Sequence, residues 1–172
     1  MPSHIRKGSS VLSILALFAA LPATARRDPS LAGTPPQSKP DAKARIGQLL
    51  QQSAYSYRST GDTTWTISRT GSNLGSYRII VAAGTDYLIL GVVVAEKRKM
   101  RMSQELLFKL LRLNDTAADF VKIGLDADED LFVRAELRVR NLDVEDFKAS
   151  TESVASVSDR VYGEIRTFLS AQ

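Results

Sequence analysis

This 172-residue chain contains no cysteine, and its one histidine, His4, lies close to the N-terminus. The absence of cysteine excludes disulfide bonds, a thiol nucleophile and a thiol that could carry a lipid. The absence of histidine after His4 removes the commonest proton shuttle and a usual ligand of transition metals. We therefore predict that the protein is not an enzyme and that it holds neither a metal nor another cofactor.

The other routes to chemistry are poorly represented as well. A serine nucleophile would need a lysine partner, and no Ser-x-x-Lys spacing occurs at the start of an expected helix. The acidic run 126–130 resembles the opening of a calcium loop, which needs glycine at its sixth position and glutamate at its twelfth. This chain has Leu131 and Leu137 there. We interpret the run as the polar tip of a hairpin.

The chain is basic overall, with 23 lysines and arginines against 19 acidic residues. The excess belongs to the N-terminal part, because five basic residues and one acidic residue precede Asp41, and 18 of each follow from Asp41 onward. A domain that binds nucleic acid normally has a basic excess of its own. We therefore predict no nucleic-acid partner for the part that begins at Asp41.

Residues 1–25 have the three parts of a Sec-type signal peptide. Two basic residues precede an apolar run, 11–21, and a small-x-small sequence, 23–25, follows it. The apolar run is shorter than the roughly 20 residues that a membrane-spanning helix needs. We expect cleavage after Ala25, a periplasmic or secreted protein, and no stable membrane insertion once the signal is removed. An uncleaved anchor is the alternative.

Residues 26–40 contain four of the six prolines of the chain, with glycine, serine and threonine between them. A sequence of this kind cannot bury enough apolar area to fold, so we expect a flexible linker here. Residues 41–172 are long enough for one domain with its own core.

After the linker, segments whose apolar residues recur at helical spacing alternate with segments whose apolar residues recur at every second position, as in a strand. Ser103 is a suitable N-cap and Asn114 a suitable stop for a helix whose apolar positions are expected to face the core: Leu106, Leu107, Leu110 and Leu111. Alternating apolar residues in 131–139 indicate a strand with one buried face.

The whole pattern predicts an α+β fold in which helices pack on a five-stranded antiparallel sheet, in the order α-β-β-β-α-β-β-α. The expected helices are 41–58, 103–114 and 143–170, and the expected strands are 65–68, 77–82, 87–94, 120–125 and 131–139.

The expected strand 87–94 is apolar at every position except Gly91. A strand that is apolar on both faces is central in its sheet or is covered on both sides. Because helices are expected on one face only, a second copy of the chain is a candidate cover for the other face. The strand therefore favours a homodimer.

Binding through surfaces remains when reactive groups are missing. An antiparallel sheet can accept an extended peptide at its edge, and an apolar helix face can accept another chain. Aromatic side chains are the natural contacts for such a partner, although each of them can instead fill the core. The candidate binding residues are Tyr55, Tyr57, Trp65, Tyr77 and Tyr87.

Three segments form a recognisable pattern of core residues: 110–114 (Leu-Leu-Arg-Leu-Asn), 122–126 (Lys-Ile-Gly-Leu-Asp) and 131–137 (Leu-Phe-Val-Arg-Ala-Glu-Leu). This pattern resembles the YbjN-domain family, which is similar in turn to the class I type III secretion chaperones. The resemblance extends over about 41–170 and consists of core positions, so it carries over no functional residue. The expected order of helices and strands also matches the fold of those chaperones.

The resemblance implies a small, often dimeric protein without known chemistry that engages other polypeptides or acts in sensory transduction. The export signal and the neutral charge of the domain depart from the cytoplasmic, acidic secretion chaperones. We therefore expect an exported, non-enzymatic domain of YbjN type that binds protein or peptide in a chaperone-like or regulatory role. A periplasmic carrier of a small molecule or lipid, held between sheet and helices, is the alternative.

Overall fold

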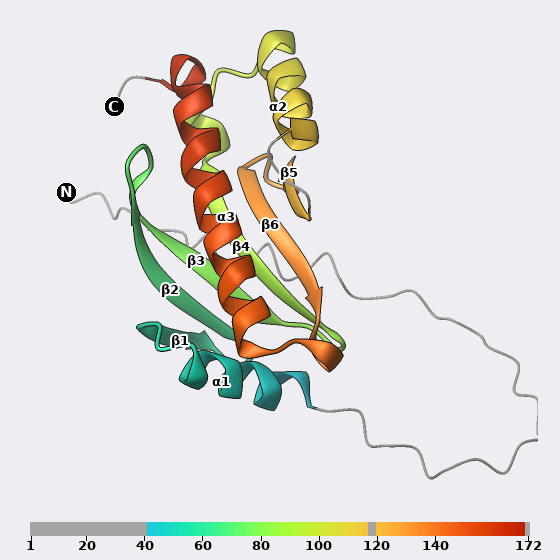
Figure 1. Ribbon diagram of the computed structural model, residues 1–172. Coiled ribbons are helices and arrows are strands. Elements are labelled where there is room, and N and C mark those ends of the chain that lie inside the picture. The colour runs from blue at the N-terminus through green and yellow to red at the C-terminus, as the bar shows by residue number, and fades with distance from the viewer. Residues whose placement is uncertain (1–40, 117–119, 171–172) are drawn as a thin grey trace, which may run out of the picture. The chain divides into compact units, whose positions relative to one another are not determined.

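Six strands form one antiparallel sheet in the computed structural model, which describes residues 41–116 and 120–170 (Figure 1). The strand order across the sheet is β1-β2-β3-β4-β6-β5. The α+β class with helices on an antiparallel sheet is therefore confirmed, whereas the predicted count of five strands was wrong. The strands are β1 (Tyr57–Gly61), β2 (Thr64–Gly71), β3 (Gly75–Ala83), β4 (Tyr87–Ala95), β5 (Val121–Leu125) and β6 (Leu131–Arg138).

The strand that the sequence pattern missed is β1, which begins at Tyr57, just before the predicted end of the first helix at Arg58. Helix α1 (Ala42–Gln52) begins after the N-cap Asp41 but ends well before Arg58. Ser53 closes it by donating its hydroxyl to the carbonyl of Leu50, 2.8 Å away, and Ala54 then adopts a left-handed φ of 60°. The chain is thereby redirected to pair with β2 as a new edge strand.

Helix α3 (Val144–Ile165) lies across the face of the sheet formed by β4 and β6 (Figure 1). Asp143 caps it, as predicted, by accepting a hydrogen bond from the backbone of Asp146 at 2.7 Å. The α-helix ends at Ile165 and a 3₁₀ turn (Arg166–Phe168) follows, so the predicted extension to residue 170 was too long.

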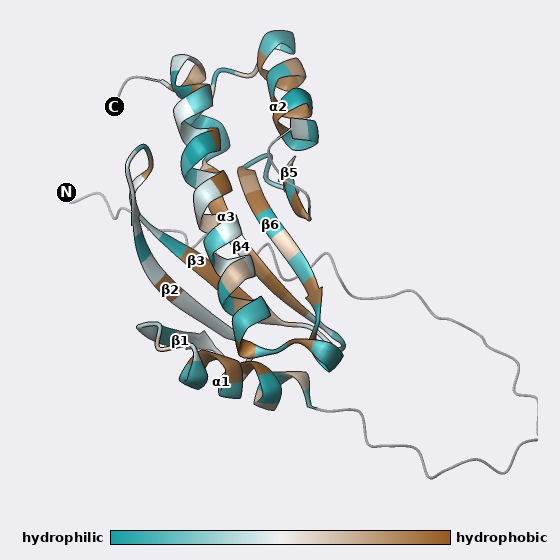
Figure 2. Cartoon of the chain, in the orientation of Figure 1, coloured by the Kyte–Doolittle hydropathy of each residue, from teal (hydrophilic) through white to brown (hydrophobic). Residues whose placement is uncertain are grey.

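The core lies between this face of the sheet and the helices. We call this side of the sheet the core face and the opposite side the outer face. In Figure 2 the visible part of β4 is largely brown, because apolar residues occupy both sides of this strand. On the core face, Leu90, Val133 and the helix residue Phe147 are fully buried.

Strand β4 is central, as predicted, because it pairs with β3 on one side and β6 on the other. Its outer-face residues, among them Ile89 and Val93, are only half-buried. The described helices all pack on the core face, so no described element covers the outer face.

Helix α2 (Gln104–Thr116) packs on β5 at the end of the sheet. The predicted N-cap is confirmed, because the Ser103 hydroxyl accepts a hydrogen bond from the backbone of Leu106 at 3.1 Å. The helix runs past Asn114, whose side chain instead accepts a hydrogen bond from the backbone of Ile123 at 2.8 Å. The predicted hairpin of 120–125 and 131–139 corresponds to β5 and β6.

The predicted signal peptide (1–25) and linker (26–40) lie outside the described residues. Within the described residues, no helix has the length and apolar character needed to cross a membrane.

Candidate functional site

The five aromatic residues predicted as binding contacts occupy different environments. Trp65 belongs to the core and is only 8% exposed, and Tyr55 and Tyr77 are half-buried against α3. Tyr57 and Tyr87 are exposed at 38% and 42%. They belong to strands at different positions in the sheet, so the five residues do not form one surface.

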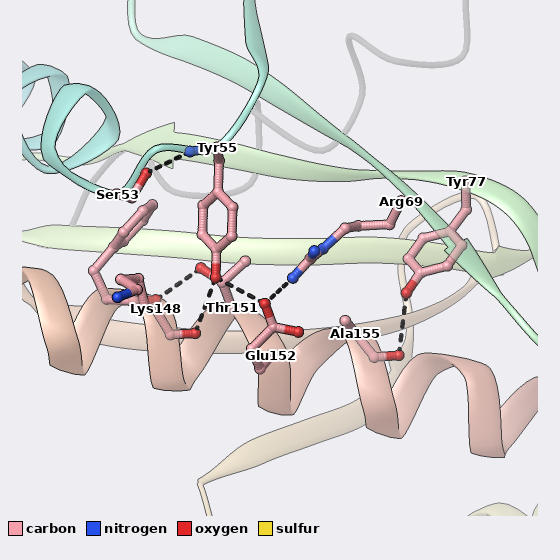
Figure 3. A network of polar contacts seen from close by, with 9 residues as sticks. Ser53, Tyr55, Arg69, Tyr77, Lys148, Thr151, Glu152 and Ala155 are labelled. Atoms are coloured by element: carbon pink, nitrogen blue, oxygen red, sulfur yellow. Dashed lines mark hydrogen bonds and ion pairs between the residues drawn. The ribbon is translucent and has the colours of Figure 1, made fainter.

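Tyr55 and Tyr77 are instead parts of a polar network that joins the sheet to α3 (Figure 3). The Tyr55 hydroxyl donates to the Glu152 carboxylate at 2.8 Å, and Arg69 forms an ion pair with the same carboxylate. The Arg69 guanidinium also lies 4.9 Å from the centre of the Tyr55 ring. The Tyr77 hydroxyl donates to the carbonyl of Ala155 at 3.4 Å.

Both tyrosines in this network act as neutral hydrogen-bond donors. Desolvation raises the pKa of Tyr55 and of Tyr77, although the nearby positive charge of Arg69 opposes the rise in both cases. Their hydroxyls are committed to partners on α3. The network therefore fixes the relative positions of β2, β3 and α3, and leaves these two rings little freedom to contact a ligand.

The largest group of exposed apolar side chains among the described residues lies on α2. We call Leu107, Phe108 and Leu111 the α2 patch; their exposed fractions are 44%, 54% and 67%. The prediction that Leu107 and Leu111 face the core was wrong, because Leu106, Leu110 and Leu113 cover β5 and turn the neighbouring stripe of the helix outward. A contiguous exposed apolar surface of this kind is typical of an interface.

Two opposite charges lie along one side of the α2 patch. Glu105 and Arg112 are seven residues apart, so both project from the same side of the helix, one near each end. Both are exposed, and neither has a side-chain partner among the described residues. The apolar patch thus has a negative group at one end of its border and a positive group at the other.

The sheet has a free edge at β1. All five residues of this strand are exposed, and among the described residues it pairs only with β2. Its outward backbone groups are available to an additional strand.

Two surface hollows of the described region are open and offer no enclosed apolar site. The larger, about 400 Å³, is lined by polar residues of α3 and by Asn73. The smaller, about 250 Å³, lies beside Phe120, Leu137 and Leu142. Buried apolar side chains of the core occupy the region between the sheet and α3.

The acidic run 126–130 forms the turn between β5 and β6. Asp126 accepts hydrogen bonds from the backbones of Asp128 and Asp130, and Asp130 accepts one from the backbone of Lys97 at 2.7 Å. Within the described part of the chain, no group of three or more potential metal ligands comes together.

Comparison with solved structures places this fold among those of type III secretion proteins. A chain of the heterodimeric ExoU–SpcU complex from the type III secretion system of Pseudomonas aeruginosa is similar with a TM-score of 0.52 and 16% identity, over 71% of this chain and 98% of that one. A chain of the ExsC–ExsE complex is similar with a TM-score of 0.54 and 14% identity, over 73% and 96%.

The Yersinia pestis type III secretion chaperone SycH, in complex with a fragment of YscM2, is a more distant match with a TM-score of 0.46 and 10% identity, over 70% and 98%. No protein-family model and no curated protein sequence matches this chain. At these identities the likeness shows the fold alone, which this chain shares with a chain of the ExoU–SpcU complex and a chain of the ExsC–ExsE complex.

Proposed function

We propose that this chain is an exported, non-enzymatic protein of YbjN type that works as a homodimer and binds other polypeptides in a chaperone-like or regulatory role. The observation that carries the proposal is the α2 patch on a chaperone-like fold. Large apolar side chains are unfavourable in water, and a group of them exposed on one surface marks an interaction site, so we expect a protein partner to cover them.

A second copy of the chain is the occupant that suits the α2 patch best, because the charges on its border are self-complementary. In a two-fold pair of antiparallel α2 helices, a residue on one flank meets the same flank of the partner helix. Glu105 of one copy then lies level with Arg112 of the other, and the reciprocal pair forms by symmetry. Phe108 falls next to the two-fold axis.

Polypeptide binding rests on the remaining free surfaces of the sheet. The β1 edge is open and exposed, as strand addition requires. The similar structures are themselves complexes of two different proteins. We infer that this fold serves a comparable purpose here, with surfaces in place of reactive groups.

Export is a separate part of the proposal and rests on the sequence of residues 1–25. The test is to express the full chain in a Gram-negative host and sequence the N-terminus of the protein recovered from the periplasm. We expect a mature protein that begins at Arg26, and recovery of uncleaved protein from the cytoplasm would contradict the export proposal.

Dimerisation is tested by sedimentation velocity on the full chain and three charge variants. Glu105→Arg and Arg112→Glu each place like charges opposite one another, so we expect each to shift the equilibrium toward monomer. The double variant E105R/R112E restores opposite charges and is expected to recover the dimer. Equal dimerisation of all four proteins would contradict the antiparallel arrangement, and a monomeric wild-type chain would contradict the dimer itself.

Polypeptide binding is tested with a fluorescently labelled, permanently unfolded polypeptide such as reduced, carboxymethylated α-lactalbumin. We expect a saturable rise in anisotropy on titration with the full chain. Failure to bind this and other unfolded polypeptides would contradict the proposed function.

A further inference from the structure

The outer face of the sheet carries a row of side chains that crosses all six strands. The strand register places Arg58, Thr66, Ile80, Gly91, Arg134 and Lys122 side by side, in that order from β1 to β5. Each lies on the outer face, because its neighbours along the strand face the core. The row therefore has a positive charge at one end and two at the other.

Positive charge dominates the outer face beyond this row. Arg78 of β3 and Arg138 of β6 also project there, so the strands contribute five cations in all. The strands contribute one anion, Glu136, which lies 3.1 Å from Arg134 and 3.7 Å from Lys122. Although residues 41–172 have no net charge, this face has a clear positive excess.

Half-buried apolar side chains lie among these cations, including Ile80, Ile89 and Val93. The Phe132 ring lies over Gly124, since a Cβ atom on that glycine would come within 3.0 Å of the Cζ atom of the ring. The face thus has a half-buried apolar centre with basic side chains around it.

The aromatic rings of the outer face are not free platforms. The Arg134 guanidinium lies 4.9 Å from the centre of the Phe132 ring, and the Arg138 guanidinium lies 5.7 Å from that of Tyr87. Nucleic-acid binding by a sheet uses exposed rings that stack on bases. Binding to a membrane surface uses apolar side chains that project and insert. On this face the Phe132 ring is half-buried, the exposed Tyr87 ring already lies beside the Arg138 guanidinium, and Ile80, Ile89 and Val93 are half-buried.

We propose that the outer face binds an acidic polypeptide segment whose carboxylates alternate with apolar side chains. Charge complementarity identifies the partner: carboxylates pair with the arginines and lysine at the border, and apolar side chains cover the half-buried centre. This inference rests on the proposed function and names the chemistry of the polypeptide that the protein receives.

The width of the sheet sets the length of the segment. Five inter-strand spacings separate β1 from β5, which corresponds to about 24 Å. About 7 residues of extended chain or about 16 residues of helix span this distance.

Two residues allow the face to be tested without disturbing the fold. Arg58 and Arg78 are exposed, and neither has a side-chain partner among the described residues. The test variant is R58E/R78E, with R58Q/R78Q as a milder version. The matched control is K43E/R160E, which makes the same change of charge at exposed positions of α1 and α3.

The probes are a fluorescein-labelled 16-residue amphipathic peptide of glutamate and leucine and its counterpart with lysine in place of glutamate. Anisotropy measured on the full chain is expected to show affinity for the acidic peptide about tenfold or more above that for the basic one, and a loss of affinity as salt is raised. R58E/R78E should lower the acidic-peptide affinity about tenfold, R58Q/R78Q less, and K43E/R160E by under about twofold.

Several outcomes overturn the inference. Equal affinity for the two peptides, or an equal loss in R58E/R78E and the control, removes the outer face as an acidic-peptide site. The inference also fails if the full chain binds oligothymidylate, or vesicles of phosphatidylglycerol and phosphatidylcholine, more tightly than the acidic peptide and if R58E/R78E abolishes that binding. A monomeric R58E/R78E would make the face a dimer contact instead. Binding of unfolded polypeptide without any charge preference contradicts this inference alone and leaves the proposed function standing.

Discussion

The carboxylate of Asp159 on α3 holds the turn between β2 and β3, and its removal gives the sharpest prediction about stability. It accepts hydrogen bonds from the backbones of Asn73 and Leu74, both at 2.8 Å, and from the Asn73 side chain at 3.1 Å. Gly71 lies so close that a Cβ atom there would collide with the carboxylate. The turn and the helix are therefore fitted to one another at this point.

Replacement of Asp159 by Asn keeps the shape of the side chain but removes its charge and one acceptor oxygen. A carboxylate that accepts two backbone hydrogen bonds, as in a helix cap, contributes about 0.5–2 kcal/mol. Because Asp159 is partly exposed, solvent reduces the electrostatic part, and we expect D159N to lower the free energy of unfolding by about 1 kcal/mol at pH 7. Asp62→Asn, an exposed turn position without a side-chain contact among the described residues, is the matched control and should change it little.

The dependence on pH separates this explanation from simple loss of packing. The backbone hydrogen bonds from Leu74 and Asn73 lower the pKa of Asp159 below its value in the unfolded chain. Its contribution is therefore complete above the unfolded pKa of about 3.9 and is lost as the pH falls through the lower folded value. Urea denaturation should show a difference between wild type and D159N that is full at neutral pH and shrinks at acid pH.

Two results would refute this reasoning. One is a D159N difference that persists unchanged after the carboxylate is protonated. The other is additivity in a double-mutant cycle with Gly71→Ala, which should displace the carboxylate and so overlap with the effect of D159N.

Two further predictions concern contacts to α3. Tyr55→Phe removes the hydroxyl that donates to Glu152, so we expect urea denaturation to show a free energy of unfolding lower by about 0.5–1 kcal/mol. Tyr57→Phe is the control and should leave the free energy of unfolding unchanged. Equal effects of the two substitutions would contradict the network. Alanine normally stabilises a helix relative to glycine by about 1 kcal/mol. We expect that gain for Gly47→Ala, because a Cβ atom at Gly47 meets open space. We expect no gain for Gly163→Ala, because a Cβ atom there would lie 2.9 Å from the Asn73 side chain. A higher Tm for Gly163→Ala would contradict the close packing of the β2–β3 turn against α3.

Sequence patterns predicted the elements whose burial is periodic. Alternation in 131–139 gave β6 with the correct core face, and Ser103 and Asp143 were identified correctly as N-caps. Strand β1 was missed because all five of its residues are exposed and no apolar period marks it. The position of β4 within the sheet was predicted from its continuous apolar run.

The candidate surfaces were harder to predict because they depend on tertiary contacts. Helix α2 has two adjacent apolar stripes, and only the placement of β5 determines that Leu106 is buried while Leu111 faces solvent. The basic residues of the outer face come from four separate strands, and their row depends on β6 lying between β4 and β5. Tyr55 and Tyr77 were predicted as binding contacts, but both form hydrogen bonds with α3, which only the tertiary structure reveals.

The pairing of two chains through α2 is tested most directly by disulfide trapping, which the absence of native cysteine makes unambiguous. In the antiparallel arrangement Phe108 lies beside its own copy, so Phe108→Cys should form an intermolecular disulfide under mild oxidation. Ser156→Cys, at an exposed position on α3, is the matched control and should remain monomeric on a non-reducing gel. Efficient cross-linking of F108C alone is the predicted result, and no cross-link in F108C, or equal cross-linking of both variants, would contradict the account.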